Sequence, residues 1–238
     1  LLGCRNVKIG RLEVDGLPCG LRTEGASGWS LDSAFLRRCA KAIDVRFNIQ
    51  NGIGPTSFTI RNVTQVDGRL DRAQDPTDAW RAKTARTVDD LLSGKSGSYV
   101  TGEDHEIDGF VQHGDAFALK CAGSRYRVAN LHGSHVFLNG AVFESRTLYP
   151  GSEYRHLHES RDVVFEDFRL VGSEAAFVDR VLLRVSYPFA NLLVRGGTFV
   201  RGTGPNGVKA AQINWTAVHF EDCDFVGWTN MAGAVELG

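Results

Sequence analysis

The 238-residue sequence predicts an all-β fold built as a solenoid, in which short strands recur along the chain and stack on one another. One pattern of apolar residues recurs through the whole chain, and its repeats are separated by a fixed minimum length with variable excess. The composition agrees, because 27 Gly and 14 Phe beside a single Met favour many short strands and turns over a helical bundle.

The recurring unit reads apolar, any, apolar, two polar or small residues, then apolar, any, apolar. This alternation predicts two short strands joined by a tight bend, each turning alternate side chains inward. The units begin at Val7, Trp29, Phe58, His105, Tyr126, Val163, Leu192 and Val218. Successive starts are 22, 29, 47, 21, 37, 29 and 26 residues apart, so the longer intervals are expected to carry insertions.

Two inward positions of the unit never carry a charge, which predicts two continuous core columns. The second inward position holds Ile9, Leu31, Ile60, Ile107, Val128, Phe165, Val194 and Phe220. The third holds Leu12, Ala34, Val63, Phe110, Leu131, Phe168, Gly197 and Cys223. Short polar residues precede several first strands and suit tight turns, namely Asn6, Asp104, Asp162 and Asn191.

A third strand in each repeat is predicted from apolar residues about a dozen positions after most starts. These residues are Cys19 and Leu21, Ile43 and Val45, Phe117 and Leu119, Phe177, Val208, and Ala234. Three strands per turn of roughly 21 or more residues resemble the right-handed parallel β-helix of the pectate-lyase type. The resemblance lies in architecture and covers nearly the whole chain, and no specific family motif accompanies it.

This resemblance implies one β-helix domain of about eight coils over residues 1–238, as part of a longer chain. A jelly roll and a pentapeptide-repeat solenoid are alternatives, the second suggested locally by "FEDCDF".

Insertions are expected at about 72–98 and 144–161. Within the first, a short helix is predicted near 76–92, because Asp75 can cap it and Trp80, Thr84, Val88 and Leu91 recur at helical spacing.

The charge balance gives no sign of a nucleic-acid or membrane partner. The 27 Lys and Arg nearly equal the 28 Asp and Glu, and no apolar run approaches the ~20 residues that span a bilayer. No cofactor is predicted, although "EDHEIDG" from Glu103 could offer oxygen ligands to Ca²⁺. The five cysteines show no metal-ligand spacing.

Candidate site residues follow from stacking, because outward side chains of adjacent coils lie about 4.8 Å apart. Glu106 and Arg127 occupy one outward position on consecutive coils, and His132 and Arg169 occupy another. These four are the predicted catalytic residues. The predicted substrate-binding residues are His113, Asp115, Lys120, His135, Tyr154 and His156.

The resemblance implies a carbohydrate-active protein that binds and cleaves an acidic polysaccharide, with β-elimination favoured over hydrolysis. Elimination needs a base for the proton α to a uronate carboxylate and a cation for the resulting charge. Asp89 and Asp90 are weak evidence for a hydrolase, because neighbours on a helix point about 100° apart.

The alternative is a non-catalytic β-helix, such as a phage tailspike shaft or surface protein. A monomer or homotrimer is expected, at an extracellular or cell-surface location.

Overall fold

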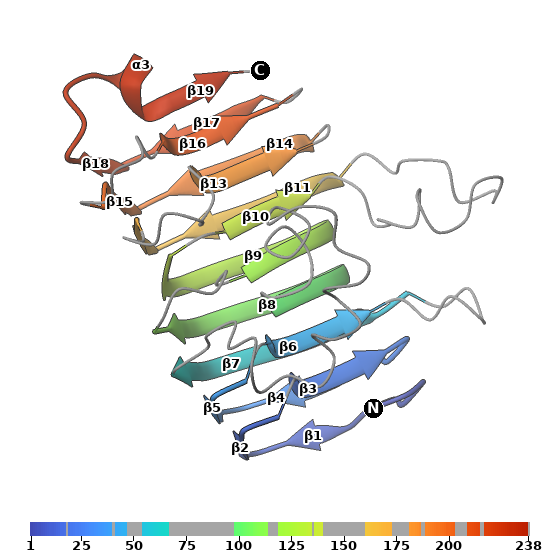
Figure 1. Cartoon of the computed structure of the whole chain (residues 1–238). Coiled ribbons are helices and arrows are strands. Elements are labelled where there is room, and N and C mark those ends of the chain that lie inside the picture. Colours follow the sequence, from blue (N-terminus) through green and yellow to red (C-terminus); the bar gives the residue numbers. More distant parts are fainter. Residues whose placement is uncertain are drawn as a thin grey trace, which may run out of the picture.

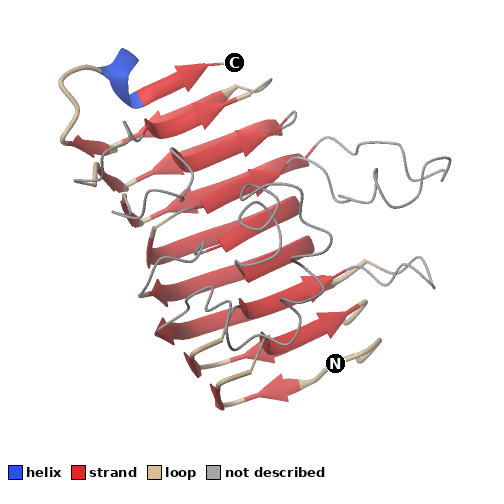
Figure 2. Cartoon of the chain, viewed as in Figure 1, coloured by secondary structure: helices blue, strands red, loops and turns tan. Residues whose placement is uncertain are grey.

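The computed structural model describes residues 1–17, 19–39, 41–46, 54–66, 98–113, 119–134, 136–139, 160–172, 181–186, 189–202, 209–214 and 217–237. Strands dominate these ranges, and the one helix in them is the short α3 (Met231–Ala234) (Figure 2). None of the helical structure in these ranges is long and apolar enough to cross a membrane.

The strands form three ladders in which every pairing is parallel. The first ladder joins β1 (Lys8–Ile9), β4 (Ser30–Leu31), β7 (Thr56–Val66), β8 (Ser98–Gln112), β9 (Leu119–Gly133), β11 (Ser160–Glu166), β14 (Phe189–Arg195) and β17 (Val218–Glu221). The second joins β2 (Leu12–Asp15), β5 (Ala34–Arg37), β7, β8, β9, β12 (Arg169–Val171), β15 (Thr198–Val200) and β18 (Asp224–Val226). The third joins β3 (Cys19–Glu24), β6 (Lys41–Arg46), β8, β9, β10 (Val136–Asn139), β13 (Val181–Ser186), β16 (Lys209–Ile213) and β19 (Val235–Leu237).

The chain passes through the first, second and third ladders in turn and then repeats that path one layer further along. We call one such layer a rung. Figure 1 shows the rungs stacked in sequence order, with the two termini at opposite ends of the stack. The long strands β7, β8 and β9 continue from one ladder into the next, because their backbone turns a corner without losing its pairing.

The first predicted core column is confirmed residue by residue. Each of its members is the register partner of the next, from Ile9 through to Phe220. The members from Leu31 to Val194 are buried, whereas Ile9 and Phe220 are partly exposed. These two lie in the first and last rungs, where a neighbour is present on one side only. Burial of this apolar column is the main driving force for stacking.

The predicted turn residues are confirmed as corners of the rungs. Asn6, Asp104, Asp162 and Asn191 have φ values of 54°, 52°, 57° and 60°. Asn and Asp adopt this left-handed conformation more readily than other non-glycine residues. The corners also bond to one another, since Asn191 Nδ2 donates to Asp162 Oδ1 at 2.9 Å.

The third ladder differs in part from the prediction. Leu21, Ile43 and Val45 lie in it as expected. Ser98, Tyr99 and Val100 also belong to it, although the sequence predicts an insertion up to about residue 98 and no third strand in this repeat. In the last rung the strand begins at Val235, one residue after the predicted Ala234, which ends α3. Phe117, Phe177 and Val208 lie outside the described residues, as do the predicted helix near 76–92 and most of both predicted insertions.

Four rings stack inside the first ladder, at the first inward position. Trp29, Phe58, His105 and Tyr126 follow one another with centroid distances of 5.0, 4.6 and 4.7 Å and nearly parallel planes. His105 is 3% exposed, and burial lowers its pKa to about 3. The imidazole is therefore neutral at physiological pH and packs as one more ring of this stack.

Candidate functional site

Glu106 and Arg127 face outward on neighbouring rungs of the first ladder, as the sequence predicts. They are register partners on β8 and β9, and Arg127 Nη1 donates to Glu106 Oε1 at 2.6 Å. The predicted pair is therefore brought together, and the two side chains form an ion pair.

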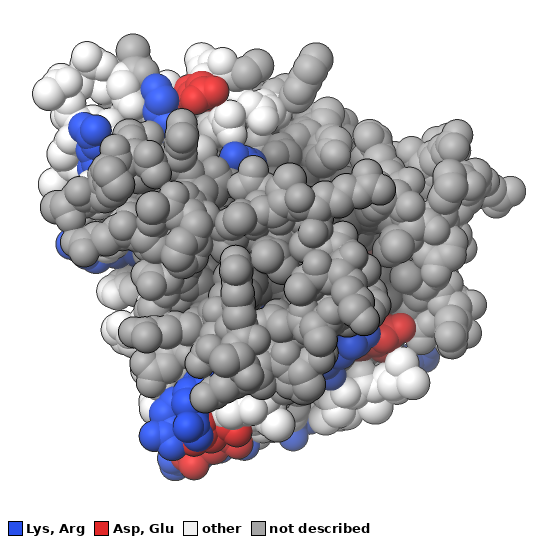
Figure 3. All heavy atoms as spheres, in the orientation of Figure 1, with Lys and Arg blue, Asp and Glu red and all other residues white. Residues whose placement is uncertain are grey.

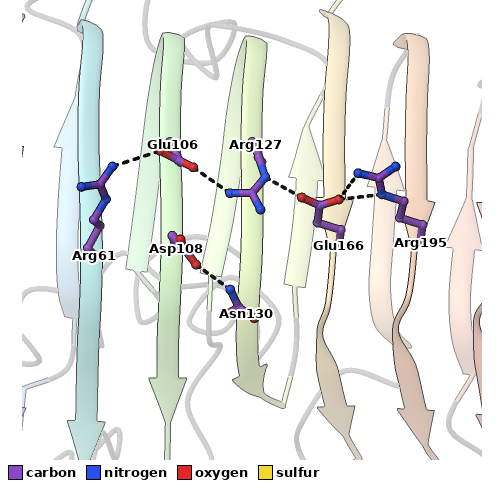
Figure 4. Close-up of polar contacts among 7 residues, drawn as sticks. All are labelled: Arg61, Glu106, Asp108, Arg127, Asn130, Glu166 and Arg195. Atoms are coloured by element: carbon purple, nitrogen blue, oxygen red, sulfur yellow. Dashed lines mark hydrogen bonds and ion pairs between the residues drawn. The ribbon is translucent and has the colours of Figure 1, made fainter.

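This ion pair is the centre of a longer chain of charges that crosses the five strands β7, β8, β9, β11 and β14, and Figure 4 shows its side chains. Arg61 lies 3.5 Å from Glu106 on one side. On the other side Arg127 Nε donates to Glu166, and Arg195 Nε donates to the second oxygen of Glu166 at 2.6 Å. Because the signs alternate, each carboxylate lies between two guanidinium groups, and Arg127 lies between two carboxylates.

The electrostatics of this chain fix the protonation of its central members. The hydrogen bond to Glu166 raises the pKa of Arg127 above its already high value. Burial raises the pKa of Glu166, but hydrogen bonds from Arg127 and Arg195 outweigh this effect and leave it below the ordinary value. Arg127 is therefore a permanent cation that cannot serve as a base, and two neighbouring carboxylates already balance its charge.

His132 and Arg169 form the second predicted pair, and they lie on neighbouring rungs of the second ladder. They are register partners on β9 and β12, and both are exposed. Neither side chain makes a hydrogen bond or an ion pair with another residue in the described ranges. Within the described ranges this pair therefore offers an accessible imidazole beside a guanidinium that has no carboxylate partner.

A shallow depression of about 450 Å³ lies where the rungs turn into the first ladder. Apart from the ring of His105, the polar residues that line it are Ser57 and Thr59 of β7, Asp104 and Glu106 of β8, Arg125 and Arg127 of β9, and Asp162 of β11. Arg125 bonds to Asp104 at 2.6 Å and to Glu103 at 2.7 Å, and the bond from Arg125 lowers the pKa of Asp104. Most of the surface of the depression is nevertheless apolar, and the charges of Arg125 and Arg127 at its border are already paired.

The remaining predicted residues are scattered. His113 is exposed just beyond the end of β8. Lys120 is only 7% exposed, and its ammonium lies 5.8 Å from the centre of the Tyr99 ring, so it is not part of an open groove. The other four predicted binding residues, Asp115, His135, Tyr154 and His156, lie outside the described residues.

No metal centre is found among the residues whose positions are described, where no three His, Cys, Asp or Glu side chains gather. In the segment that could offer oxygen ligands to Ca²⁺, Glu103 and Asp104 both bond to Arg125 instead. The five cysteines are free thiols.

Sequence reasoning missed Glu166, Arg195 and Arg61, which complete the chain of charges. They occupy the next outward column, in which Arg61, Asp108, Ala129, Glu166, Arg195 and Glu221 are successive partners. The charges at these positions are visible in the sequence, although Ala129 interrupts their alternation. What the repeat could not show is that Arg127 reaches diagonally from its own column to Glu166.

Paired charges also occur elsewhere on the surface. Figure 3 shows basic and acidic atoms side by side at the end of the stack where β2 and β5 lie. There Asp15 bonds to both Arg37 and Arg38. Exposed cations in the stack are thus commonly matched by carboxylates, whereas Arg169, like Arg161, makes no such pair within the described ranges.

The comparisons with known proteins return no relative. No family model, curated protein or solved structure matches the chain. The class that the described residues define is an all-β protein made almost entirely of parallel sheet, which is compatible with a β-helix.

Proposed function

We propose that the chain is a right-handed parallel β-helix of about eight coils that binds a polysaccharide across its central rungs. The ladders support this proposal, because parallel stacking presents outward residues in straight columns at about 4.8 Å spacing. Such columns suit an extended, repetitive ligand. The depression on the first ladder would hold sugar hydroxyl groups through its carboxylates, guanidinium groups and hydroxyls.

We further propose that the bound glycan contains uronate sugars and is cleaved by β-elimination. The observation that carries this proposal is the exposed, unpaired His132–Arg169 neighbourhood on β9 and β12. In the neutral form His132 accepts the proton α to the uronate carboxylate. The electron pair of that C–H bond forms the new C=C bond, the glycosidic C–O bond breaks, and the leaving oxygen takes a proton from solvent. Arg169 stabilises the negative charge that develops on the carboxylate.

Within this proposal the four predicted catalytic residues divide into two roles. His132 and Arg169 act on the reacting sugar. Glu106 and Arg127 line the depression and position the glycan, because the charge of Arg127 is already balanced by two carboxylates. A cation in that condition contributes less to an enolate-like transition state than a free one does.

Affinity electrophoresis in gels that contain polygalacturonate tests the binding step. The wild type should migrate more slowly than in gels without the glycan, and Arg169→Ala should lose most of that retardation. Arg161→Ala is the matched control, because Arg161 is an exposed cation on neighbouring β11 that the proposal does not use. Equal retardation of the wild type and Arg169→Ala, or greater loss in the control, would contradict the assignment.

A non-catalytic shaft is the second candidate, and the chain of charges on the first ladder favours it. The alternating groups from Arg61 to Arg195 satisfy one another across five strands, which is what a stiff structural element requires. A stable trimer in light scattering that neither binds nor cleaves glycans would favour this function.

A further inference from the structure

One outward column of the second ladder passes through six successive strands without a carboxylate. Its members are register partners from β5 to β15, namely Phe35, Thr64, Val111, His132, Arg169 and Thr198. All of them are at least partly exposed. We call these six residues the carboxylate-free column. The next residues on either side of it are acidic, Glu13 on β2 and Asp224 on β18.

The outward column on the other side of the corner has a different character. It lies in the first ladder and contains Arg61, Asp108, Glu166 and Arg195, and there Arg195 pairs with Glu166. In the carboxylate-free column Arg169 is the only Lys or Arg, and within the described ranges it makes no ion pair. A bound anion therefore meets a single available guanidinium group rather than a row of charges.

The side chains around Arg169 favour neutral sugars. Val171 and Val200 face outward on the same strands as Arg169 and Thr198 and are register partners of each other. On the other side of His132 the next member of the column is Val111. A carboxylate held against valine loses hydration without gaining a hydrogen bond, whereas the C–H groups of a pyranose ring do not pay that penalty. The threonine hydroxyl both donates to and accepts from sugar hydroxyls.

The spacing of the rungs relates sugars to residues. Neighbouring members of the column are about 4.8 Å apart, the distance between paired strands. An extended pyranose chain rises by a similar length per sugar, so a chain that lies along the stack places one sugar on each rung. When a uronate lies on the rung of Arg169, the adjacent sugars lie beside His132 and Thr198. The second sugar on the His132 side lies over Val111.

We propose that the glycan bound along this column is a heteropolysaccharide in which neutral sugars separate each uronate from the next. This inference rests on the proposed function, because it takes the His132–Arg169 site as given and specifies the glycan that occupies it. One uronate carboxylate pairs with Arg169, and neutral sugars lie on the rungs of Thr198 and Val111. A polymer of uronate alone would hold unpaired carboxylates against Val111 and bring others toward Asp224, which repels them.

Calorimetric titration with oligosaccharides of eight sugars tests this proposal. His132→Ala is the host protein, so that elimination does not consume the ligand. The probes are fragments of deacylated gellan, with one uronate in every four sugars, of hyaluronan, with one in every two, and of polygalacturonate, with one at every sugar. The dissociation constant should rise in that order, by at least about fivefold from gellan to polygalacturonate. An equal or reversed order would overturn the proposal.

Val111→Lys in the same host separates the effect of charge spacing from the other differences among these glycans. The added cation should tighten polygalacturonate binding by at least about threefold and should change gellan binding by less than about twofold. Leu193→Lys is the matched control, because it adds the same charge at a half-buried outward position of the first ladder, on β14. Thermal unfolding checks that both variants fold. Equal gains for the two glycans, or the same gain in the control, would contradict the proposal.

The proposed function and this inference fail in different ways. If none of the three probes binds, or if Arg169→Ala in the same host leaves gellan binding unchanged, the glycan site itself is misplaced and both are wrong. If polygalacturonate binds most tightly and Arg169→Ala abolishes that binding, the site stands and only the inference about uronate spacing is wrong.

Discussion

Arg127 and Glu166, 39 residues apart in sequence, are joined by a hydrogen bond between neighbouring rungs. Glu166 is only 5% exposed, and Arg127 and Arg195 bind one oxygen of its carboxylate each. The bond therefore connects a nearly buried anion to the outward face of the first ladder. Together with the bond to Glu106 it balances the positive charge of Arg127. For this reason we assign the role of catalytic cation to Arg169.

A double-mutant cycle on this pair should show a favourable coupling energy. We expect about 1 kcal/mol for Arg127→Ala combined with Glu166→Gln, a modest value because the Arg127 side chain is 39% exposed and solvent screens the pair. Urea unfolding of the four proteins measures it. A coupling energy indistinguishable from zero would mean that the chain of charges does not hold the rungs together.

Phe165→Ala should cost roughly 3–5 kcal/mol of unfolding free energy. Its ring is fully buried and stacks on Phe168 at a centroid distance of 4.1 Å, so truncation leaves a cavity that the rigid rungs cannot close. Phe35→Ala is the control, since Phe35 is 46% exposed and its loss should cost about 0.5 kcal/mol or less. Similar losses for both variants in denaturant titrations would contradict the core column.

Gly197→Ala should destabilise the protein by about 1–3 kcal/mol, because a Cβ at this position would come within 2.0 Å of the Phe168 ring. Phe168→Leu should relieve the clash, so the double variant should lose less stability than the sum of the two single ones. Gly10→Ala is the matched control, because nothing lies within 4 Å of its added Cβ. Additive losses at 197 and 168 would show that the two residues do not share the space.

The stability of the fold should fall as the pH is lowered from about 6.5 toward 3, and His105 should account for part of the slope. Below pH 6.5 the unfolded chain takes up a proton on this imidazole, whereas the folded state, with a pKa of about 3, does not. One such group lowers the unfolding free energy by about 1.4 kcal/mol for each pH unit below 6.5 within that window, and it has no effect above the window.

His105→Phe should keep the ring stack between Phe58 and Tyr126 and remove that contribution. Urea unfolding at pH 7 and pH 5 should therefore show a smaller pH dependence for the variant than for the wild type. Carboxylates with lowered pKa values that do not interact with His105, such as Asp15 and Glu166, act in the same direction in both proteins and cancel in the comparison. An unchanged pH dependence would show that His105 is protonated in the folded state.

Much of the stacking register could be predicted from the sequence, because side chains alternate strictly within a strand and the same apolar positions recur in every unit. Ile9 to Phe220 follow one another as predicted for this reason. The strand at Tyr99 and Val100 was not predicted, because these residues lie between a long insertion and the start of the next unit at His105. Only these two residues of β8 pair with β6 in the third ladder, although the pairing of β8 with β9 already begins at Ser98.

For the candidate site, the sequence could predict only which residues occupy the same position on neighbouring rungs. Glu106 with Arg127, and His132 with Arg169, are adjacent because the register makes them so. Whether a charge is free or already paired depends on long side chains that cross between columns. The repeat pattern does not show which side chains make such contacts. Lys120 illustrates the same limit, because its outward position did not reveal that it would be buried beside Tyr99.

The most direct test of the account is the rate at which the protein produces unsaturated sugar ends from uronate polysaccharides, followed by ultraviolet absorbance. The wild type should cleave at least one such glycan. His132→Ala and Arg169→Ala should each lose a hundredfold or more in turnover with an unchanged melting temperature, while Arg161→Ala keeps the wild-type rate. Undiminished cleavage by both His132→Ala and Arg169→Ala would place the chemistry elsewhere, and a wild type inactive on every uronate glycan would contradict the proposed reaction.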